Sequence, residues 1–336
     1  MLDRRAWERP GAVEVAPGVH RIPLPLPNDG LRAVNVYAIV DGDGVVLIDA
    51  GWALDEARTR LAAGLGEIGF ELGDVREFLV THAHRDHYTQ AVVLRRVFGS
   101  RVSLGAGERE CLRLVRSESG SAHNASRLRE AGAADIARQA EAWRERADPE
   151  EWTDPDRWLD DGVELPLSTR TLRVIATPGH TRGHVVYLDS ANQALFSGDH
   201  VLPHITPSIG VEPNRPPSPL RDYLASLALV RALPDARLFP AHGPVAESVH
   251  ERVDELLAHH ADRLEATAGV VDHGAETGFE AARALPWTRR GRRFDDLDLF
   301  NQILAVQETM AHLRVLVDQG ALTRSDVDGV AHFARI

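Results

Sequence analysis

Apolar residues in the first fifty positions follow the two-residue period that is typical of β-strands. Val13–Pro23 and Ala33–Asp49 alternate or run apolar, and Asp41-Gly42-Asp43-Gly44 has the composition of a tight hairpin turn. The chain is therefore expected to begin with antiparallel strands.

Helical and strand patterns then alternate. Helices are expected from about Ala53 to Ile68 and from about Thr89 to Phe98, and strands at Phe78-Leu79-Val80 and Arg101-Val102-Ser103-Leu104. From Leu172 onward the strand-rich pattern returns, which predicts a second, facing sheet. This order predicts an α/β fold of the αββα type, in which two stacked sheets are flanked by helices.

The densest group of chemically active side chains is Thr81-His82-Ala83-His84-Arg85-Asp86-His87, directly after an apolar run. Imidazole nitrogens and carboxylate oxygens are the usual ligands of zinc, and they also suit iron or manganese. Alternating residues at a strand end point to one side, so His82 and His84 could bind one ion together. Asp86 and His87 would turn to a different side, where they could bind a second ion.

Three more candidate ligands follow strand-like segments in the second half of the chain. They are His180 in Thr177-Pro178-Gly179-His180, Asp199 in Phe196-Ser197-Gly198-Asp199, and His242 in Phe239-Pro240-Ala241-His242-Gly243. An isolated histidine is more often a surface or core residue than a ligand, which describes most of the 16 histidines here. Four strand-end segments that all carry ligand-type residues indicate one shared metal site.

These motifs, in this order, resemble the metallo-β-lactamase superfamily from about Val13 to about Glu247. Asp49 resembles the first family motif, the cluster from His82 to His87 the second, and the three later ligands the third to fifth. By this resemblance one metal would be held by His82, His84 and His180, a second by Asp86, His87 and His242, and Asp199 would bridge them. Asp49 would orient the ligands or the loop beneath them.

Two divalent metal ions at such a site, zinc first and iron or manganese as alternatives, imply hydrolysis. Together they would lower the pKa of a bridging water and generate hydroxide at neutral pH. One metal would also polarise the carbonyl or phosphoryl group under attack, so no serine or cysteine nucleophile is required. Asp86 and Asp199 could relay a proton to the leaving group.

Three residues beside the motifs could shape the reaction. Tyr88-Thr89-Gln90 stands where the family usually has two glycines, so the Tyr88 phenol could donate a hydrogen bond to a developing oxyanion. Packing of Tyr88 against a neighbouring segment is the alternative. His200 and His204 follow the bridging aspartate, and we expect them to contact ligands or substrate without binding metal.

The segment from Glu108 to about Trp158 interrupts the expected sandwich between the second and third motifs. It is charged, rich in alanine and arginine, and helical in character. Such an insertion could overhang the metal edge as a lid or substrate wall, with apolar contacts from Trp143, Trp152 and Trp158. Alternatively, these tryptophans attach the inserted helices to the core.

The region from residue 249 onward is expected to form helices and then a small β-hairpin. Helices are predicted at Val249–Ala268, Phe279–Ala284 and Leu297–Gln319, and the hairpin turn at Asp326-Val327-Asp328-Gly329. Together with Glu308-Thr309 and His312-Leu313, this pattern resembles the winged-helix-like tail of the lactamase-like β2 branch. We therefore divide the chain into a catalytic domain, 1–248, and a C-terminal domain, 249–336.

A winged helix also suggests nucleic-acid binding, and Arg289-Arg290-Gly291-Arg292-Arg293 is the dense basic cluster nearby. Asp295, Asp296 and Asp298 follow it at once and offset its charge. The formal net charge of the chain is −12, whereas proteins that bind long polyanions usually present a basic surface. These charges favour a packing or substrate-wall role for the tail over a nucleic-acid partner.

Composition bounds the remaining properties. A chain of 336 residues with 43% hydrophobic content can bury a large core. No segment resembles a transmembrane span and the N-terminus lacks an apolar signal core, so a cytoplasmic location without a membrane partner is expected. The single cysteine, Cys111, fits that location and is expected to act as a small buried hydrophobe. A homodimer is compatible with the sequence.

The resemblance alone leaves several reactions open, because the superfamily includes thioesterases, lactonases, nucleases and persulfide dioxygenases. Asp86 favours two metals over a single iron, and the segment from Gly198 to Pro207 resembles the members that hydrolyse small molecules. We therefore expect a metal-dependent hydrolase of the glyoxalase II and lactamase-like branch, which cleaves a thioester or another activated carboxyl ester of a small molecule. A lactonase, an RNA phosphodiesterase and a single-iron persulfide dioxygenase are the alternatives.

Overall fold

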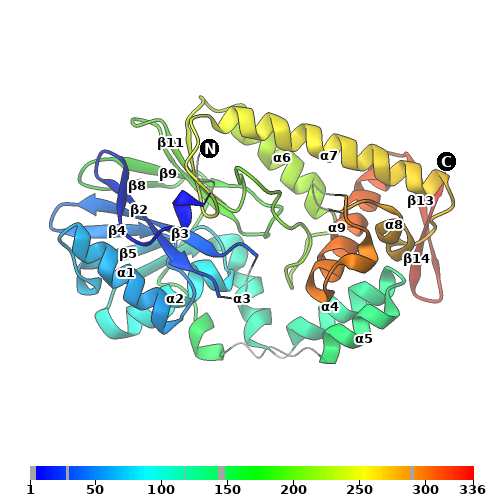
Figure 1. The fold of residues 1–336 in the computed structure, drawn as a ribbon, viewed down its shortest axis with the longest axis horizontal. Helices are drawn as coiled ribbons and strands as arrows, with labels where there is room; N and C mark the ends of the chain where they lie inside the picture. The colour runs from blue at the N-terminus through cyan, green and yellow to red at the C-terminus, as the bar shows by residue number, and fades with distance from the viewer. Residues whose placement is uncertain (1–4, 28–29, 118, 143–147, 288–290) are drawn as a thin grey trace.

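The computed structural model describes residues 5–27, 30–117, 119–142, 148–287 and 291–336. Two β-sheets face each other at one end of the molecule, and a group of helices with a small hairpin forms the other end (Figure 1). The long helix α7 runs between the two ends.

The first sheet contains seven strands in the order β1 to β7. They are β1 (Val13–Ala16), β2 (Val19–Pro25), β3 (Ala33–Asp41), β4 (Gly44–Ile48), β5 (Val75–Val80), β6 (Arg101–Gly105) and β7 (Arg157–Leu159). The pairs from β1 to β4 are antiparallel, and those from β4 to β7 are parallel. The predicted strands and the turn between Asp41 and Gly44 are confirmed, and β7 begins where the inserted segment, Glu108 to about Trp158, was expected to end.

The second sheet contains five strands in the order β12, β11, β10, β9, β8. They are β8 (Glu164–Pro166), β9 (Thr171–Ala176), β10 (Val185–Asp189), β11 (Ala194–Gly198) and β12 (Arg237–Pro240). Neighbouring strands are antiparallel except for β11 and β12, which are parallel. Consequently β9, β11 and β12 all run in the same direction, and their carboxyl ends meet at one edge.

The αββα arrangement predicted from the sequence is confirmed by its three apolar layers. The inner faces of the two sheets share a core in which the Tyr37, Phe196 and Phe239 rings meet at centroid distances of 5.2 to 5.6 Å. Helices α1 (Asp55–Glu67) and α2 (Arg85–Phe98) cover the outer face of the first sheet. Helices α6 (Pro219–Arg231) and α7 (Val249–Asp272) cover the second.

Helix α2 begins four residues earlier than predicted, at Arg85 instead of Thr89. The prediction was late because the apolar spacing starts only at Ala91, whereas the first turn carries polar side chains. Asp86 and His87 therefore lie in the first turn of a helix, and His84 caps it in an extended conformation.

The inserted segment and the C-terminal region supply the remaining helices. These are α3 (Arg109–Arg116), α4 (Ser119–Glu130), α5 (Ala134–Ala142), α8 (Gly278–Ala284) and α9 (Leu299–Asp318). A two-stranded hairpin, β13 (Leu322–Val327) and β14 (Val330–Arg335), ends the chain, as predicted. Short 3₁₀ helices lie at Ala6–Glu8, Leu72–Asp74, Ala106–Glu108, Pro149–Trp152 and Phe294–Asp296.

The inserted segment packs in two directions. Helices α4 and α5 share an apolar core with α8, α9, the hairpin and the end of α7, and they lie beside α9 in Figure 1. Trp152 and Trp158 instead pack into the core of the first sheet, which favours their structural role over substrate contact. Trp143 lies outside the described residues, as do Arg289 and Arg290 of the basic cluster.

A membrane-crossing helix would need a long apolar stretch. Among the described residues, no helix is both long and apolar enough to span a bilayer.

Candidate metal centre

Five strand or helix ends bring the predicted ligands together at one edge of the sandwich. His82 and His84 follow β5, and Asp86 and His87 lie at the start of α2. The three later candidates follow the co-directional strands of the second sheet: His180 after β9, Asp199 after β11 and His242 after β12.

The first group of ligand atoms comes from His82, His84, His180 and Asp199, whose donor atoms all lie within 4.8 Å of one another. Nδ1 of His84 lies 2.9 Å from Nε2 of His82 and 3.1 Å from Nε2 of His180. The Asp199 Oδ2 atom is 3.4 Å from Nε2 of His180. Three imidazoles and a carboxylate thus converge on one point.

The second group comes from Asp86, His87 and His242, and it satisfies the same 4.8 Å limit. The Asp86 Oδ2 atom lies 3.6 Å from Nε2 of His87 and 3.5 Å from Nε2 of His242. The other carboxylate oxygen of Asp199, Oδ1, lies 3.7 Å and 3.3 Å from the same two nitrogens. Asp199 therefore presents one oxygen to each group.

The position of Asp199 depends on a close approach at the preceding residue, Gly198. Its φ is +50°, and a Cβ atom there would lie 2.7 Å from the Thr81 side chain and 2.8 Å from Nε2 of His184. A side chain at this position would push the strand end away from the β5 loop, so glycine is required.

The outward nitrogens of three histidines are held by acceptors, which turns their other nitrogens toward the centre. Nδ1 of His87 lies 2.9 Å from Asp49 Oδ2. Nδ1 of His180 and of His242 donates to the backbone carbonyls of Ser208, at 2.7 Å, and Ala33, at 2.8 Å. Such bonds fix the tautomer that leaves Nε2 free to bind a metal.

Asp49 itself sits at a conformation that side chains rarely adopt, with φ of +60°. Its carboxylate is buried and accepts from the backbone N–H of Thr81 at 2.8 Å and from the Thr81 hydroxyl at 3.0 Å. The Thr81 hydroxyl also lies 3.0 Å from Nδ1 of His82. Asp49 therefore reaches ligands of both groups, directly at His87 and through Thr81 at His82.

The donor set fits divalent metal ions. Nε2 of His87, Nε2 of His242 and Oδ1 of Asp199 are buried without a hydrogen-bond partner among the described residues, which is costly unless a cation satisfies them. Burial lowers the pKa of His84 to about 3 and that of His180 to about 4, so both are neutral at pH 7. Neighbouring carboxylates instead raise the pKa of His87 to about 10, so a bound metal would displace its proton. Neutral imidazole and ionised carboxylate are the forms that bind zinc.

One residue at the centre was not singled out in the sequence. Nε2 of His184 accepts from the backbone N–H of Asp199 at 3.2 Å, and its Nδ1 donates to the Thr177 hydroxyl at 2.9 Å. Its ring stacks on His82 at a centroid distance of 5.0 Å. The repeated Gly-His pair at 179–180 and 183–184 was the available signal, since it places two histidines in one loop.

Tyr88 does not face the ligand atoms. Its ring is fully buried and lies 6.4 Å from the Trp152 ring, and its hydroxyl donates to the backbone carbonyl of Thr153 at 2.6 Å. This bond occupies the hydroxyl, so the structure favours the packing role of Tyr88 over the oxyanion role.

The two histidines that follow Asp199 differ in their surroundings. The His200 ring is buried against His184 and Tyr223, whereas His204 is exposed. Neither belongs to a potential metal-binding group among the described residues. His200 thus supports the ring that positions Asp199.

A two-sheet sandwich with histidine and aspartate ligands along one edge defines a class of metal-dependent hydrolase folds. The chain belongs to the metallo-beta-lactamase superfamily, whose family model matches residues 29–242.

Solved structures extend this relationship beyond the matched residues. The metallo-beta-lactamase family protein TTHA1429 from Thermus thermophilus is 28% identical, with a TM-score of 0.79 over 96% of this chain and 100% of that one. A beta-lactamase domain protein from Burkholderia ambifaria is 27% identical, with a TM-score of 0.77 over 97% and 95% of the two chains. Both alignments include the C-terminal helices.

Two of the curated relatives match shorter parts of the chain. A beta-lactamase-like protein 2 homolog from Caenorhabditis elegans is 32% identical over 44% of this chain and 49% of its own length. An atrochrysone carboxyl ACP thioesterase from Aspergillus fumigatus is 26% identical over 68% of this chain and 56% of its own. The chain thus matches about half the length of these two relatives.

Proposed function

We propose that this protein is a two-metal hydrolase that cleaves a thioester or another activated carboxyl ester of a small molecule. The observation that carries the proposal is the Asp199 carboxylate, which turns one oxygen to each of two ligand groups. Zinc is the proposed metal, because three imidazoles in one group and two in the other suit a borderline cation.

Each part of the site has a role in this reaction. Two divalent cations bound between the ligand groups would lower the pKa of a shared water and stabilise negative charge on the attacked carbonyl group. His82, His84 and His180 would hold one cation, and Asp86, His87 and His242 the other. Asp86, which lies at the more exposed side of the centre, would accept the proton of the water and return it to the leaving group.

The substrate class is inferred from two further facts. One relative is named as a thioesterase that acts on an acyl carrier protein, which supports an activated acyl group as substrate. The net charge of −12 disfavours a long polyanion such as RNA, which supports a small molecule instead. A lactone is the second candidate, since its ester needs the same attacking water. A cytoplasmic location and a homodimer remain predictions.

A substrate panel tests this proposal. Protein loaded with zinc should hydrolyse acyl-coenzyme A or acyl-glutathione faster than homoserine lactone or single-stranded RNA. The variant His84→Ala should lose the activity, because it removes one of the three imidazoles that would hold the first cation. Asp55→Asn, on the exposed face of α1, should retain the activity. Cleavage of RNA alone would overturn the substrate class. Oxidation of a persulfide by protein that carries one iron would overturn the hydrolase assignment.

A further inference from the structure

A third group of ligand-type side chains lies apart from the two groups that meet at Asp199. The donor atoms of Glu108, Cys111 and Glu212 all lie within 4.8 Å of one another. Glu108 and Cys111 are one helical turn apart where the inserted segment enters α3. Glu212 comes from the segment that links β11 to α6. None of the three belongs to the ligand groups around Asp199.

The carboxylates of this cluster are buried and incompletely paired. Glu212 is 3% exposed, and neither of its carboxylate oxygens has a hydrogen-bond partner among the described residues. The Arg127 guanidinium lies beside it but donates to the backbone carbonyls of Glu212 and Pro213, at 2.7 and 2.6 Å. The backbone N–H of Arg182 faces the carboxylate without a hydrogen bond of normal geometry.

Glu108 is fully buried and shows the same deficiency at one oxygen. Its Oε1 accepts from the Thr181 hydroxyl, whereas Oε2 has no hydrogen bond of normal geometry among the described residues. The backbone N–H groups of Ala83 and Gly183 and the Cys111 thiol face this carboxylate. Two buried carboxylates side by side repel each other and lose their hydration, which is costly unless protons or a cation offset their charge. Burial accordingly raises the pKa of both carboxyl groups, and the charge of Glu108 raises that of Glu212 further.

We propose that Glu108, Cys111 and Glu212 bind a further divalent cation, separate from the centre at Asp199. Two carboxylates would give an oxygen-preferring site, but the thiol of Cys111 adds a soft donor that selects zinc or cobalt over magnesium and calcium. A bound cation would deprotonate the thiol and satisfy the three unpartnered oxygens.

Such a cation would join two segments, the start of α3 and the link between β11 and α6, that both contact the loop that carries His180. Glu108 accepts from Thr181, next to His180, and Gly107 packs so tightly on Gly183 that a Cβ on either would clash with the other's segment. The Glu212 segment also contains Ser208, whose carbonyl accepts from His180. The proposed role is therefore to hold the loop that carries His180.

Cobalt titration of metal-stripped protein tests this site directly. Cys111 is the single cysteine of the chain, and the ligand groups at Asp199 contain only nitrogen and oxygen donors. A thiolate-to-cobalt charge-transfer band in the near ultraviolet can therefore arise only at Cys111. We expect this band on cobalt addition, and we expect Cys111→Ser to abolish it. Elemental analysis of zinc-loaded protein should show that Cys111→Ser binds about one equivalent less than the wild type.

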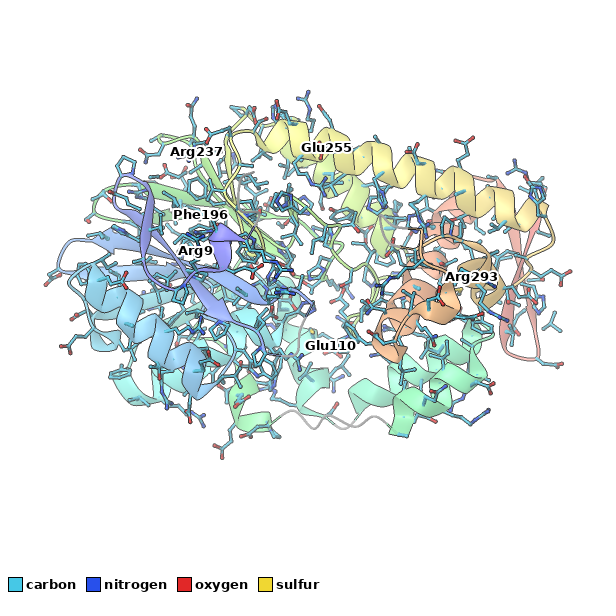
Figure 2. The ribbon with its side chains drawn as sticks, viewed as in Figure 1. Arg9, Glu110, Phe196, Arg237, Glu255 and Arg293 are labelled. Carbon is cyan, nitrogen blue, oxygen red and sulfur yellow. The ribbon has the colours of Figure 1, made fainter. Side chains whose placement is uncertain are left out.

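Two further variants separate the cation site from a proton-sharing pair. Glu212→Gln should weaken the cobalt band, because it removes a charged ligand, whereas Glu110→Gln should leave it unchanged. Glu110 lies on α3 next to Cys111 (Figure 2). Its side chain is half exposed and paired with Arg113. No charge-transfer band, with equal zinc content in wild type and Cys111→Ser, would overturn the proposal and identify a carboxyl pair that shares a proton. These readouts do not depend on the hydrolysis reaction.

Discussion

Asp49 shows how a single buried carboxylate can position ligands of both groups. It accepts from Thr81 and orients His87, and it does so from a backbone conformation that only a few residue types tolerate. The position after β4 requires two acceptor oxygens, for Thr81 and His87, and a residue that tolerates a positive φ. Aspartate meets both requirements.

We predict that Asp49→Asn lowers metal affinity roughly 10- to 100-fold. Asparagine tolerates the same φ, so the backbone should be retained. Its amide group, however, must turn an N–H toward either Thr81 or His87. At His87 this favours the tautomer with a proton on Nε2, which cannot bind metal. Competition with a chromogenic zinc chelator measures the effect, with Asp55→Asn as the exposed control. Unchanged zinc affinity would show that Asp49 does not orient His87.

The Tyr88 hydroxyl donates to the backbone carbonyl of Thr153 and not toward the ligand atoms. Tyr88→Phe removes a buried hydrogen bond to Thr153, so we expect a loss of about 1 kcal/mol in the free energy of unfolding. Because the hydroxyl does not face the ligand atoms, kcat should stay within about twofold of the wild type. Denaturant titration and steady-state kinetics check the two parts. A large fall in kcat with unchanged stability would restore the oxyanion role.

Sequence alone predicted the seven candidate ligands because each lies shortly after an apolar strand. The carboxyl ends of strands that run in the same direction meet at one edge of a sheet. Sequence did not reveal the role of His184: the repeated Gly-His pair places this histidine in the loop of His180, but only the structure shows that its ring accepts from the backbone N–H of Asp199. Nor could sequence decide the orientation of Tyr88, because both of its roles require the same residue at the same position. Contacts between distant segments decided both points.

At the scale of elements, the start of α2 and the packing of the insertion were least predictable. The first turn of α2 carries polar residues that face the centre, so the apolar period hides it. Helices α4 and α5 have an apolar face whose partner, the C-terminal core, lies far away in sequence. Neither feature is a local property of its segment.

Helix α4 also contacts the segment between β11 and α6 through Arg127. We predict that Arg127→Ala speeds hydrogen exchange in residues 205–217, because two carbonyls lose a charged donor. The exposed neighbour Arg129, which pairs with Glu141, provides the control variant Arg129→Ala. Equal exchange in both variants would mean that α4 does not hold this segment in place.

Across the whole molecule, helix α9 connects two cores. Leu313 and Met310 pack with α4, α5 and the hairpin, whereas Ala311 and Val315 pack with α6 and α7 over the second sheet. The division into domains 1–248 and 249–336 remains a prediction. Each of these two apolar cores contains residues from both regions.

We predict that Leu313→Ala destabilises the protein by about 2 to 5 kcal/mol, because Leu313 is fully buried in this shared core. Protection from hydrogen exchange should fall in α4 as well as in α9. Val327→Ala, at a half-exposed position of the hairpin, should have little effect. Loss of protection in α9 alone would indicate that the inserted helices fold independently of the C-terminal region.

The proposed reaction depends on a pair of metal ions that share the Asp199 carboxylate. The most direct test is a crystal structure of zinc-loaded protein with anomalous scattering recorded at the zinc edge. We predict two peaks about 3.5 Å apart, one among His82, His84 and His180 and the other among Asp86, His87 and His242. A single peak at this edge of the sheets, or peaks that the Asp199 carboxylate does not contact, would contradict it.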